Sequence, residues 1–356
     1  MKLKFLILLT FTSFIKCFSQ YGDNFDINYH KLEGKVKSLE QYSYDAAIKN
    51  GKIVKASDKK KSVKWDKDFK VNFDQNGNML RKIFLDSLGN ETWAIINTYD
   101  KKGNMTESIS YVNQSIESKA TAEYNEFSKL ITRSRYYGEN DKPYETQTYI
   151  YDENNRIKKL IIGGDIYEYF YSKKGVLNQM NRLINGNQLV QSTFYNDKEK
   201  IIKKLTYDYN KNITSTGSYI YDRNSNLINY TSIDGDGIIK NATETKYNNK
   251  NLVLEEIKYK GKKEVSRKEV SEYDKKGKLT LVINYNSKGK VTRKVKYEYD
   301  KKGNIIEHLT FFQNSETPDD RISYSYEFDK YNNWVTKNYL ENDKPKYVFK
   351  RKISYY

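Results

Sequence analysis

The chain has 356 residues, a formal net charge of +17 and a mean hydropathy of −0.90. It contains 34 Tyr but only three Pro and two His. Two histidines leave few candidate residues for a His-rich metal site or a Ser-His-Asp triad. Tyr and Thr favour strands, whereas Asn and Gly favour tight turns. The composition therefore predicts an all-β fold.

The first twenty residues, MKLKFLILLTFTSFIKCFSQ, have the layout of a secretory signal peptide: a basic start, an apolar run and a small, polar end. The apolar run is about half the length that a membrane-spanning helix needs. The residues before Cys17 lack the small side chains of a lipoprotein signal. We therefore predict a signal peptide at 1–20 and a mature chain without cysteine or transmembrane segment. It would be exported to the periplasm, the cell surface or the exterior.

From about residue 36 onward, an aromatic residue followed by Asp or Asn recurs about every 26 residues, most clearly between 73 and 340. Clear copies of this anchor are FDQNGN at 73, YDKKGN at 99, YDENNR at 151, YDRNSN at 221, YDKKGK at 273, YDKKGN at 299 and FDKYNN at 328. A second turn follows about twelve residues after most anchors, as in LDSLGN at 85. Each unit is thus predicted to be one β-hairpin.

About a dozen such units predict about 24 strands in a single β-repeat domain at 21–356. We expect a continuous antiparallel β-hairpin meander, curved or superhelical, because open sheets of more than about ten strands rarely stay flat. Within each anchor, the Asp is expected to accept backbone N–H groups two residues on. Gly103 and Gly303 would supply a positive φ, and the following Asn tolerates a similar geometry. The motif then closes turns and needs no ligand.

The anchors resemble the YD repeat of the RHS family over about residues 36–356. In that family, such hairpins join into a long β-sheet that spirals into a shell. Large members enclose a C-terminal toxin, and others are surface proteins for which carbohydrate binding has been suggested. The last thirty-one residues look like the end of small secreted members from bacteria of the Bacteroidetes type. Because the repeat reaches Tyr356 and no toxin domain follows it, we do not carry over toxin delivery.

Two carboxylate patterns have a functional and a structural interpretation. The anchor aspartates could form an array for metal or acid–base chemistry, but one per hairpin places them roughly 10 Å apart. We therefore favour turn caps for Asp74, Asp100, Asp152, Asp222, Asp274, Asp300 and Asp329. The DGDG segment at 234–237 hints at a calcium loop, but Thr245 stands where an EF-hand needs Glu. A hairpin turn is the favoured interpretation there too.

Aromatic and basic residues are the remaining candidates for binding. Trp65, Trp93 and Trp334 could stack on sugar rings, although core packing or cross-strand ladders are favoured site by site. The basic run KASDKKKSVK at 55–64 is interpreted as a solvated loop or hairpin tip, with contact to a polyanion as the alternative.

No catalytic residue, cofactor or metal site is predicted, because a repeat distributes equivalent residues instead of assembling one unique set. We expect a binding or scaffold module for glycans or other extracellular macromolecules. A purely structural or self-associating module and a carboxylate-based glycan hydrolase are the alternatives. A nucleic-acid partner is not expected, because the basic residues are mostly Lys and the chain is exported. The oligomeric state stays open.

Overall fold

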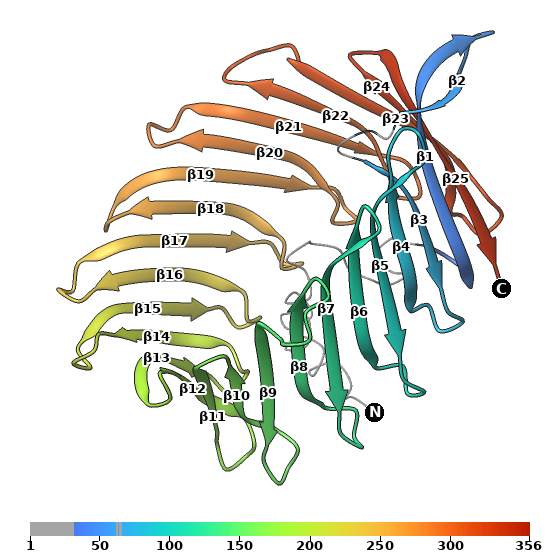
Figure 1. Ribbon diagram of the computed structural model, residues 1–356. Coiled ribbons are helices and arrows are strands. Elements are labelled where there is room, and N and C mark those ends of the chain that lie inside the picture. Colours follow the sequence, from blue (N-terminus) through green and yellow to red (C-terminus); the bar gives the residue numbers. More distant parts are fainter. Residues whose placement is uncertain (1–31, 62, 64–65) are drawn as a thin grey trace. The chain divides into compact units, whose positions relative to one another are not determined.

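The computed structural model describes residues 32–61, 63 and 66–356 (Figure 1). The proposed signal peptide at 1–20 and Trp65 lie outside these residues. The described part contains 25 strands and no helix. The all-β prediction is therefore confirmed.

The strands follow one another with short turns between them. In chain order they are β1 (Val36–Lys49), β2 (Lys52–Lys60), β3 (Asp68–Phe73), β4 (Met79–Leu85), β5 (Glu91–Tyr99), β6 (Met105–Val112), β7 (Ser115–Tyr124), β8 (Leu130–Tyr137), β9 (Glu145–Tyr151), β10 (Ile157–Ile162), β11 (Asp165–Tyr171), β12 (Leu177–Ile184), β13 (Gln188–Tyr195), β14 (Ile201–Tyr207), β15 (Ile213–Tyr221), β16 (Leu227–Asp234), β17 (Ile239–Tyr247), β18 (Val253–Lys260), β19 (Glu264–Tyr273), β20 (Leu279–Asn286), β21 (Val291–Tyr299), β22 (Ile305–Phe312), β23 (Asp320–Phe328), β24 (Trp334–Glu341) and β25 (Lys344–Tyr355).

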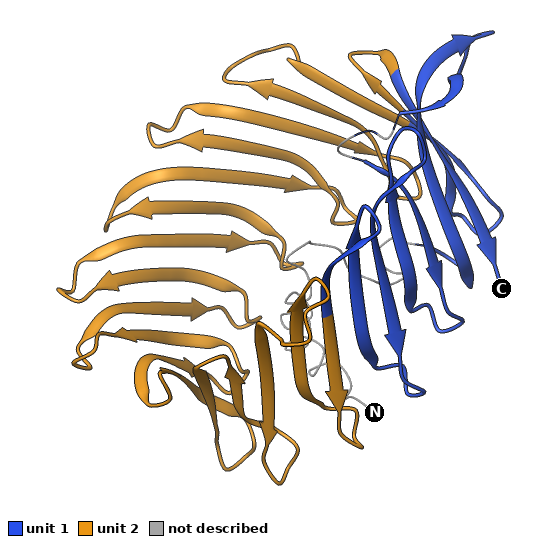
Figure 2. Ribbon diagram, in the orientation of Figure 1, with its two compact units in different colours: residues 1–119, 325–338, 346–356 blue, residues 120–324, 339–345 orange. Residues whose placement is uncertain are grey.

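The chain divides into two compact units, coloured separately in Figure 2. Unit 1 comprises Met1–Lys119, Ser325–Asn338 and Lys346–Tyr356, and unit 2 comprises Ala120–Tyr324 and Tyr339–Pro345. The assignment of 21–356 to a single repeat domain stays a prediction.

Unit 2 is an antiparallel meander in which each strand from β8 to β22 pairs with the next one in sequence. The register shifts by one residue beside each anchor turn, for example between Glu298 and Tyr299. Such a shift is a β-bulge, which adds one residue to one strand and increases the local twist. The predicted succession of antiparallel hairpins is confirmed.

Unit 1 is organised around β1, which pairs with strands from both ends of the described chain. On one side β1 pairs with β25, from Val36↔Tyr355 to Asp45↔Tyr347. It also pairs with β3 and with β2. A superhelical meander would leave its first and last strands apart, so this pairing contradicts the superhelical prediction. Pairing β1 with β25 satisfies backbone groups that two free edge strands would expose.

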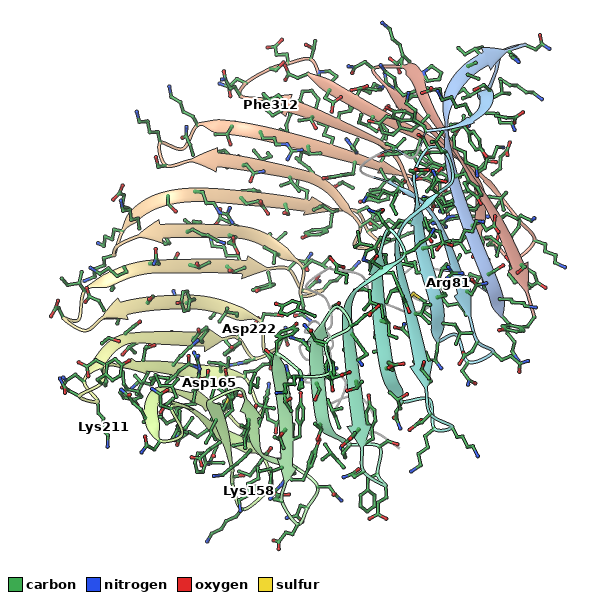
Figure 3. All side chains as sticks on the ribbon, in the orientation of Figure 1. Arg81, Lys158, Asp165, Lys211, Asp222 and Phe312 are labelled. Carbon is green, nitrogen blue, oxygen red and sulfur yellow. The ribbon has the colours of Figure 1, made fainter. Side chains whose placement is uncertain are left out.

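The apolar core lies mainly in unit 1, where alternate residues of β1 and β3 are almost completely buried. The largest cluster consists of Leu32, Val36, Leu39, Phe69, Val71, Phe73, Met79 and Ile95. Strands of unit 2 are instead mostly half-buried, either along their whole length, as in β16 and β20, or with exposed residues between, as in β21. Exposed side chains there include Lys158, Lys211 and Phe312 (Figure 3).

Candidate functional site

The Asp carboxylate of an anchor turn accepts hydrogen bonds from groups of the same turn. In the YDKKGN turn at 99–104, Asp100 Oδ1 accepts the N–H groups of Lys102 at 2.8 Å and Asn104 at 2.9 Å. Asp100 Oδ2 accepts Nδ2 of Asn104 at 2.8 Å. The bonds from the side-chain amide and backbone of Asn104 lower the pKa of Asp100. The carboxylate is therefore a turn cap, as predicted.

Gly103 has φ of 81° and Gly303 of 95°, so the predicted positive φ is confirmed at both glycines. Neither Asn104 nor Asn304 has a positive φ, so the turn does not use the tolerance of Asn for that geometry. Each instead lies opposite its Asp across the bulge and donates its amide to the second carboxylate oxygen.

The same turn recurs with either Asp or Asn in its first position. Asn125, Asn196, Asn248 and Asn286 accept the corresponding two backbone N–H groups through Oδ1. Asp234 of the DGDG segment makes this turn as well, accepting the N–H groups of Asp236 and Ile238. Because a neutral amide closes the turn equally well, negative charge is not what the repeat requires. No cluster of three potential metal-binding side chains occurs in the ranges that the structure describes.

The anchor tyrosines donate hydrogen bonds to the preceding, neighbouring strand, which the sequence reasoning missed. Tyr299 OH donates to the carbonyl oxygen of Leu279 at 2.8 Å. The equivalent bond, always to the residue twenty positions earlier, is made by Tyr99, Tyr221, Tyr247 and Tyr273. Tyr in place of Phe at the anchors between 73 and 328 was the signal that could have revealed it. The tyrosine and aspartate of these anchors are thus both engaged in internal hydrogen bonds.

Other aromatic side chains form ladders across neighbouring strands. Tyr219 and Tyr230 face each other on β15 and β16, with ring centres 4.9 Å apart. Another series runs through Tyr297, His308 and Tyr324, with spacings of 6.1 and 6.3 Å. The ladder interpretation is confirmed for these residues.

Trp93 lies beside a surface hollow in unit 1. Its ring is 5.4 Å from that of Phe84 and packs partly against the apolar core. The hollow has a volume of about 310 Å³ and is lined by Arg81, Glu91, Trp93, Ala94, Ile96, Tyr111 and Gln114. Arg81, which extends from β4 (Figure 3), donates to both carboxylate oxygens of Glu91 at 2.9 Å. Tyr111 lies opposite Ala94 on one face of β5 and β6, whereas the Trp93 ring lies on the other face against the apolar core. The hollow thus combines Tyr111, an exposed Ile96 and a fixed polar pair.

Trp334 has a different environment. The guanidinium carbon of Arg351 lies 3.5 Å from the ring centre, and Lys337 Nζ lies 5.2 Å from it. One face of this indole is therefore covered by a cation. Trp65, the third predicted tryptophan, lies outside the described residues.

A second hollow, in unit 2, has a volume of about 410 Å³ and is bordered by anchor turns. Asp222 on its border (Figure 3) caps its own turn through Asn226. Lys198 donates to the carbonyl of Arg223 and to Ser225 Oγ. Lys198 and Asp222 are therefore already engaged in internal bonds.

The basic run at 55–64 forms the return strand of the β1–β2 hairpin as far as Lys60. Its side chains are mostly exposed, and Lys55 pairs with Asp58. The predicted solvation is confirmed for the described part of the run, but the prediction of a loop or hairpin tip is wrong, because these residues form a strand and the tip lies at Asn50 and Gly51. Among the residues placed by the structure, none belongs to a helix long and apolar enough to cross a membrane.

No protein-family description and no curated protein matches the chain. Solved structures that match include a TcdB2-TccC3-Cdc42 crystal structure, with 11% identity and a TM-score of 0.36 over 78% of this chain and 16% of that chain. A Tc holotoxin pore from Photorhabdus luminescens matches with 10% identity and a TM-score of 0.32, covering 80% of this chain and 19% of that one. A porin-like protein from Bacteroides uniformis is 10% identical with a TM-score of 0.23, and the match covers 91% of this chain and 99% of that one. This chain spans less than a fifth of the toxin chains, and at these TM-scores the similarities do not establish a shared fold.

Proposed function

We propose that the chain is an exported, non-catalytic repeat protein that binds carbohydrate, with the Trp93 hollow as the binding site. The observation that carries this proposal is the combination of Tyr111 and the exposed Ile96 beside a hollow of about 310 Å³. Small-molecule sites start at about 300 Å³, so this volume suits one sugar ring. A pyranose has an apolar face of C–H groups, which packs well against an aromatic ring.

The polar groups of the hollow support a sugar over a purely apolar ligand. Arg81 and Glu91 hold each other in a two-pronged ion pair, and Gln114 adds an amide. Groups fixed in this way accept hydrogen bonds from sugar hydroxyls and donate hydrogen bonds to them at little cost in side-chain entropy. A single hollow of this size predicts weak binding of one glycan. We therefore expect detectable binding where several copies of the glycan are displayed together.

Glycan hydrolysis is the less favoured proposal for this hollow. Among the described residues that line it, Glu91 is the one carboxylate, and it is paired with Arg81. Canonical glycoside hydrolysis uses two carboxylates flanking the scissile bond. A purely structural or self-associating module is the stronger rival, because the anchor Tyr and Asp groups are engaged in internal bonds.

A glycan array probed at low and high salt tests the proposal. We expect binding by the parent protein that survives high salt, since ring stacking is not screened by ions. Tyr111→Ala should abolish it, whereas Phe312→Ala, an exposed aromatic outside the hollow, should leave it intact. Trp93→Ala and Trp334→Ala provide the tests of the two described tryptophans. Absence of glycan binding by the parent protein, together with self-association in light scattering, would favour the structural module instead.

A further inference from the structure

A cluster of charged and aromatic side chains lies beside the apolar core of unit 1. Gln41 on β1 and Arg351 on β25 are direct cross-strand partners. Lys337 comes from β24, and Asp66 precedes β3. Gln41 lies two residues beyond the buried core residue Leu39 on the same strand, so the cluster extends one edge of the core.

In this cluster two cations share one carboxylate. Lys337 Nζ lies 2.6 Å from Asp66 Oδ2, and Gln41 Nε2 donates to Asp66 Oδ1 at 2.7 Å. Arg351 Nε donates to Gln41 Oε1 at 3.0 Å. Gln41, which is 2% exposed, thus links the arginine to the carboxylate without neutralising it. The group of four side chains carries one excess positive charge.

Aromatic rings hold both cations in place. Arg351 stacks 3.5 Å over the Trp334 ring, and Lys337 Nζ lies 4.2 Å from the ring centre of Phe349. Burial lowers the pKa of Arg351 to about 9 and also lowers that of Lys337, although Asp66 opposes both shifts. An excess charge in such surroundings is costly unless an anion accompanies it.

The two Nη nitrogens of the Arg351 guanidinium indicate the chemical class of that anion. Its Nε is used by Gln41, and no residue of the described ranges accepts a hydrogen bond from the two Nη nitrogens. A guanidinium fork matches the two oxygens of a carboxylate in a bidentate pair. One carboxylate also balances the single excess charge, whereas a phosphate dianion would exceed it. We propose that Arg351, stacked on Trp334, binds the carboxylate group of an acidic ligand such as a uronic acid.

This site is separate from the Trp93 hollow and does not depend on the proposal made for it. It requires a carboxylate and a cation, whereas the hollow is proposed to bind sugar rings through apolar contact. The two proposals therefore fail independently.

Nuclear magnetic resonance of the arginine Nε–Hε groups in the full chain tests the site directly. Glucuronate, acetate, glucose and inorganic phosphate would each be titrated at constant ionic strength. We expect a saturable shift of the Arg351 resonance with glucuronate and none with glucose. Saturation by acetate as well would show that the carboxylate suffices, and binding of glucuronate alone would show that the sugar ring contributes. No shift with glucuronate, or phosphate binding as tight as the carboxylate, would overturn the proposal.

Three variants separate this site from general electrostatic attraction. Arg351→Met and Arg351→Lys should each weaken glucuronate binding at least tenfold, the second because Lys keeps the charge but lacks the planar fork. Lys352→Met removes the same charge from the next residue of β25, whose side chain is exposed, and should change affinity less than twofold. Equal losses in Arg351→Met and Lys352→Met would refute a specific site. If both Arg351 variants fail to fold, the titration of the parent protein still decides.

Discussion

The hydroxyl of the anchor tyrosine contributes to the stability of the fold, and a substitution that removes this one oxygen atom tests the contribution. Tyr299 OH on β21 donates to the carbonyl of Leu279, at the start of β20, across 2.8 Å. Tyr299→Phe keeps the ring and removes only this bond. A typical intramolecular hydrogen bond contributes about 1 kcal/mol net. We therefore expect the free energy of unfolding to fall by about 1 kcal/mol.

The same strand supplies a matched control. Tyr297 lies two residues earlier, and its ring packs against His308 with the centres 6.1 Å apart. Its hydroxyl makes no hydrogen bond with any residue of the described ranges, so Tyr297→Phe should leave stability nearly unchanged. Combining Tyr→Phe at the anchors 221, 247, 273 and 299 removes four bonds, each of them between a different pair of neighbouring strands. Such separated changes should add to about 4 kcal/mol.

Urea unfolding followed by far-ultraviolet circular dichroism measures these differences. The urea midpoints are compared between variants whose free energy of unfolding depends equally steeply on urea concentration. A change in stability is then not confused with a change in cooperativity. Two results would refute the reasoning: an equal loss in Tyr297→Phe and Tyr299→Phe, or a fourfold variant no less stable than the single one.

Three further predictions concern the turns and the junction of the chain ends. Gly289→Ala should cost roughly 1 kcal/mol, because φ is 71° and an added Cβ meets nothing within 4 Å. Gly164→Ala, equally open but without such a φ, should cost less in the same urea assay; equal costs would contradict this. Because hydrogen bonds lower its pKa, Asp100 contributes stability above its unfolded pKa of about 3.9, and this is lost as pH falls through the folded pKa. Asp100→Asn should therefore reduce the acid dependence of the urea midpoint, and an unchanged dependence would count against the cap. Asn333→Ala removes bonds to Glu33 N at 2.7 Å and Glu33 O at 2.8 Å, and should cost roughly 2 kcal/mol. Hydrogen exchange at Glu33 should then accelerate, and unaltered protection would contradict the role of Asn333.

The candidate binding residues were only partly predictable. Trp93 was identified by residue type alone, because a tryptophan offers a large flat surface. Tyr111 was not identified, since it reaches the same hollow through the pairing of β5 with β6, where it lies opposite Ala94. For Trp334, the sequence gave no sign that Arg351 would cover one ring face. Cross-strand neighbours depend on register, which residue type does not specify.

The sequence by itself determined the hairpins and their turns, because the information is local. The Asp, Gly and Asn of each YDKKGN turn interact within five residues, so their spacing alone indicates the geometry. Only the tertiary structure decided how the two ends of the repeat meet. Arg351 contacts Gln41 from 310 positions away, and Lys337 contacts Asp66 from 271 positions away. Any strand edge offers the same backbone donors and acceptors, so no local pattern marks β25 as the partner of β1. Their pairing creates the buried excess charge at Arg351, which no repeat unit carries alone.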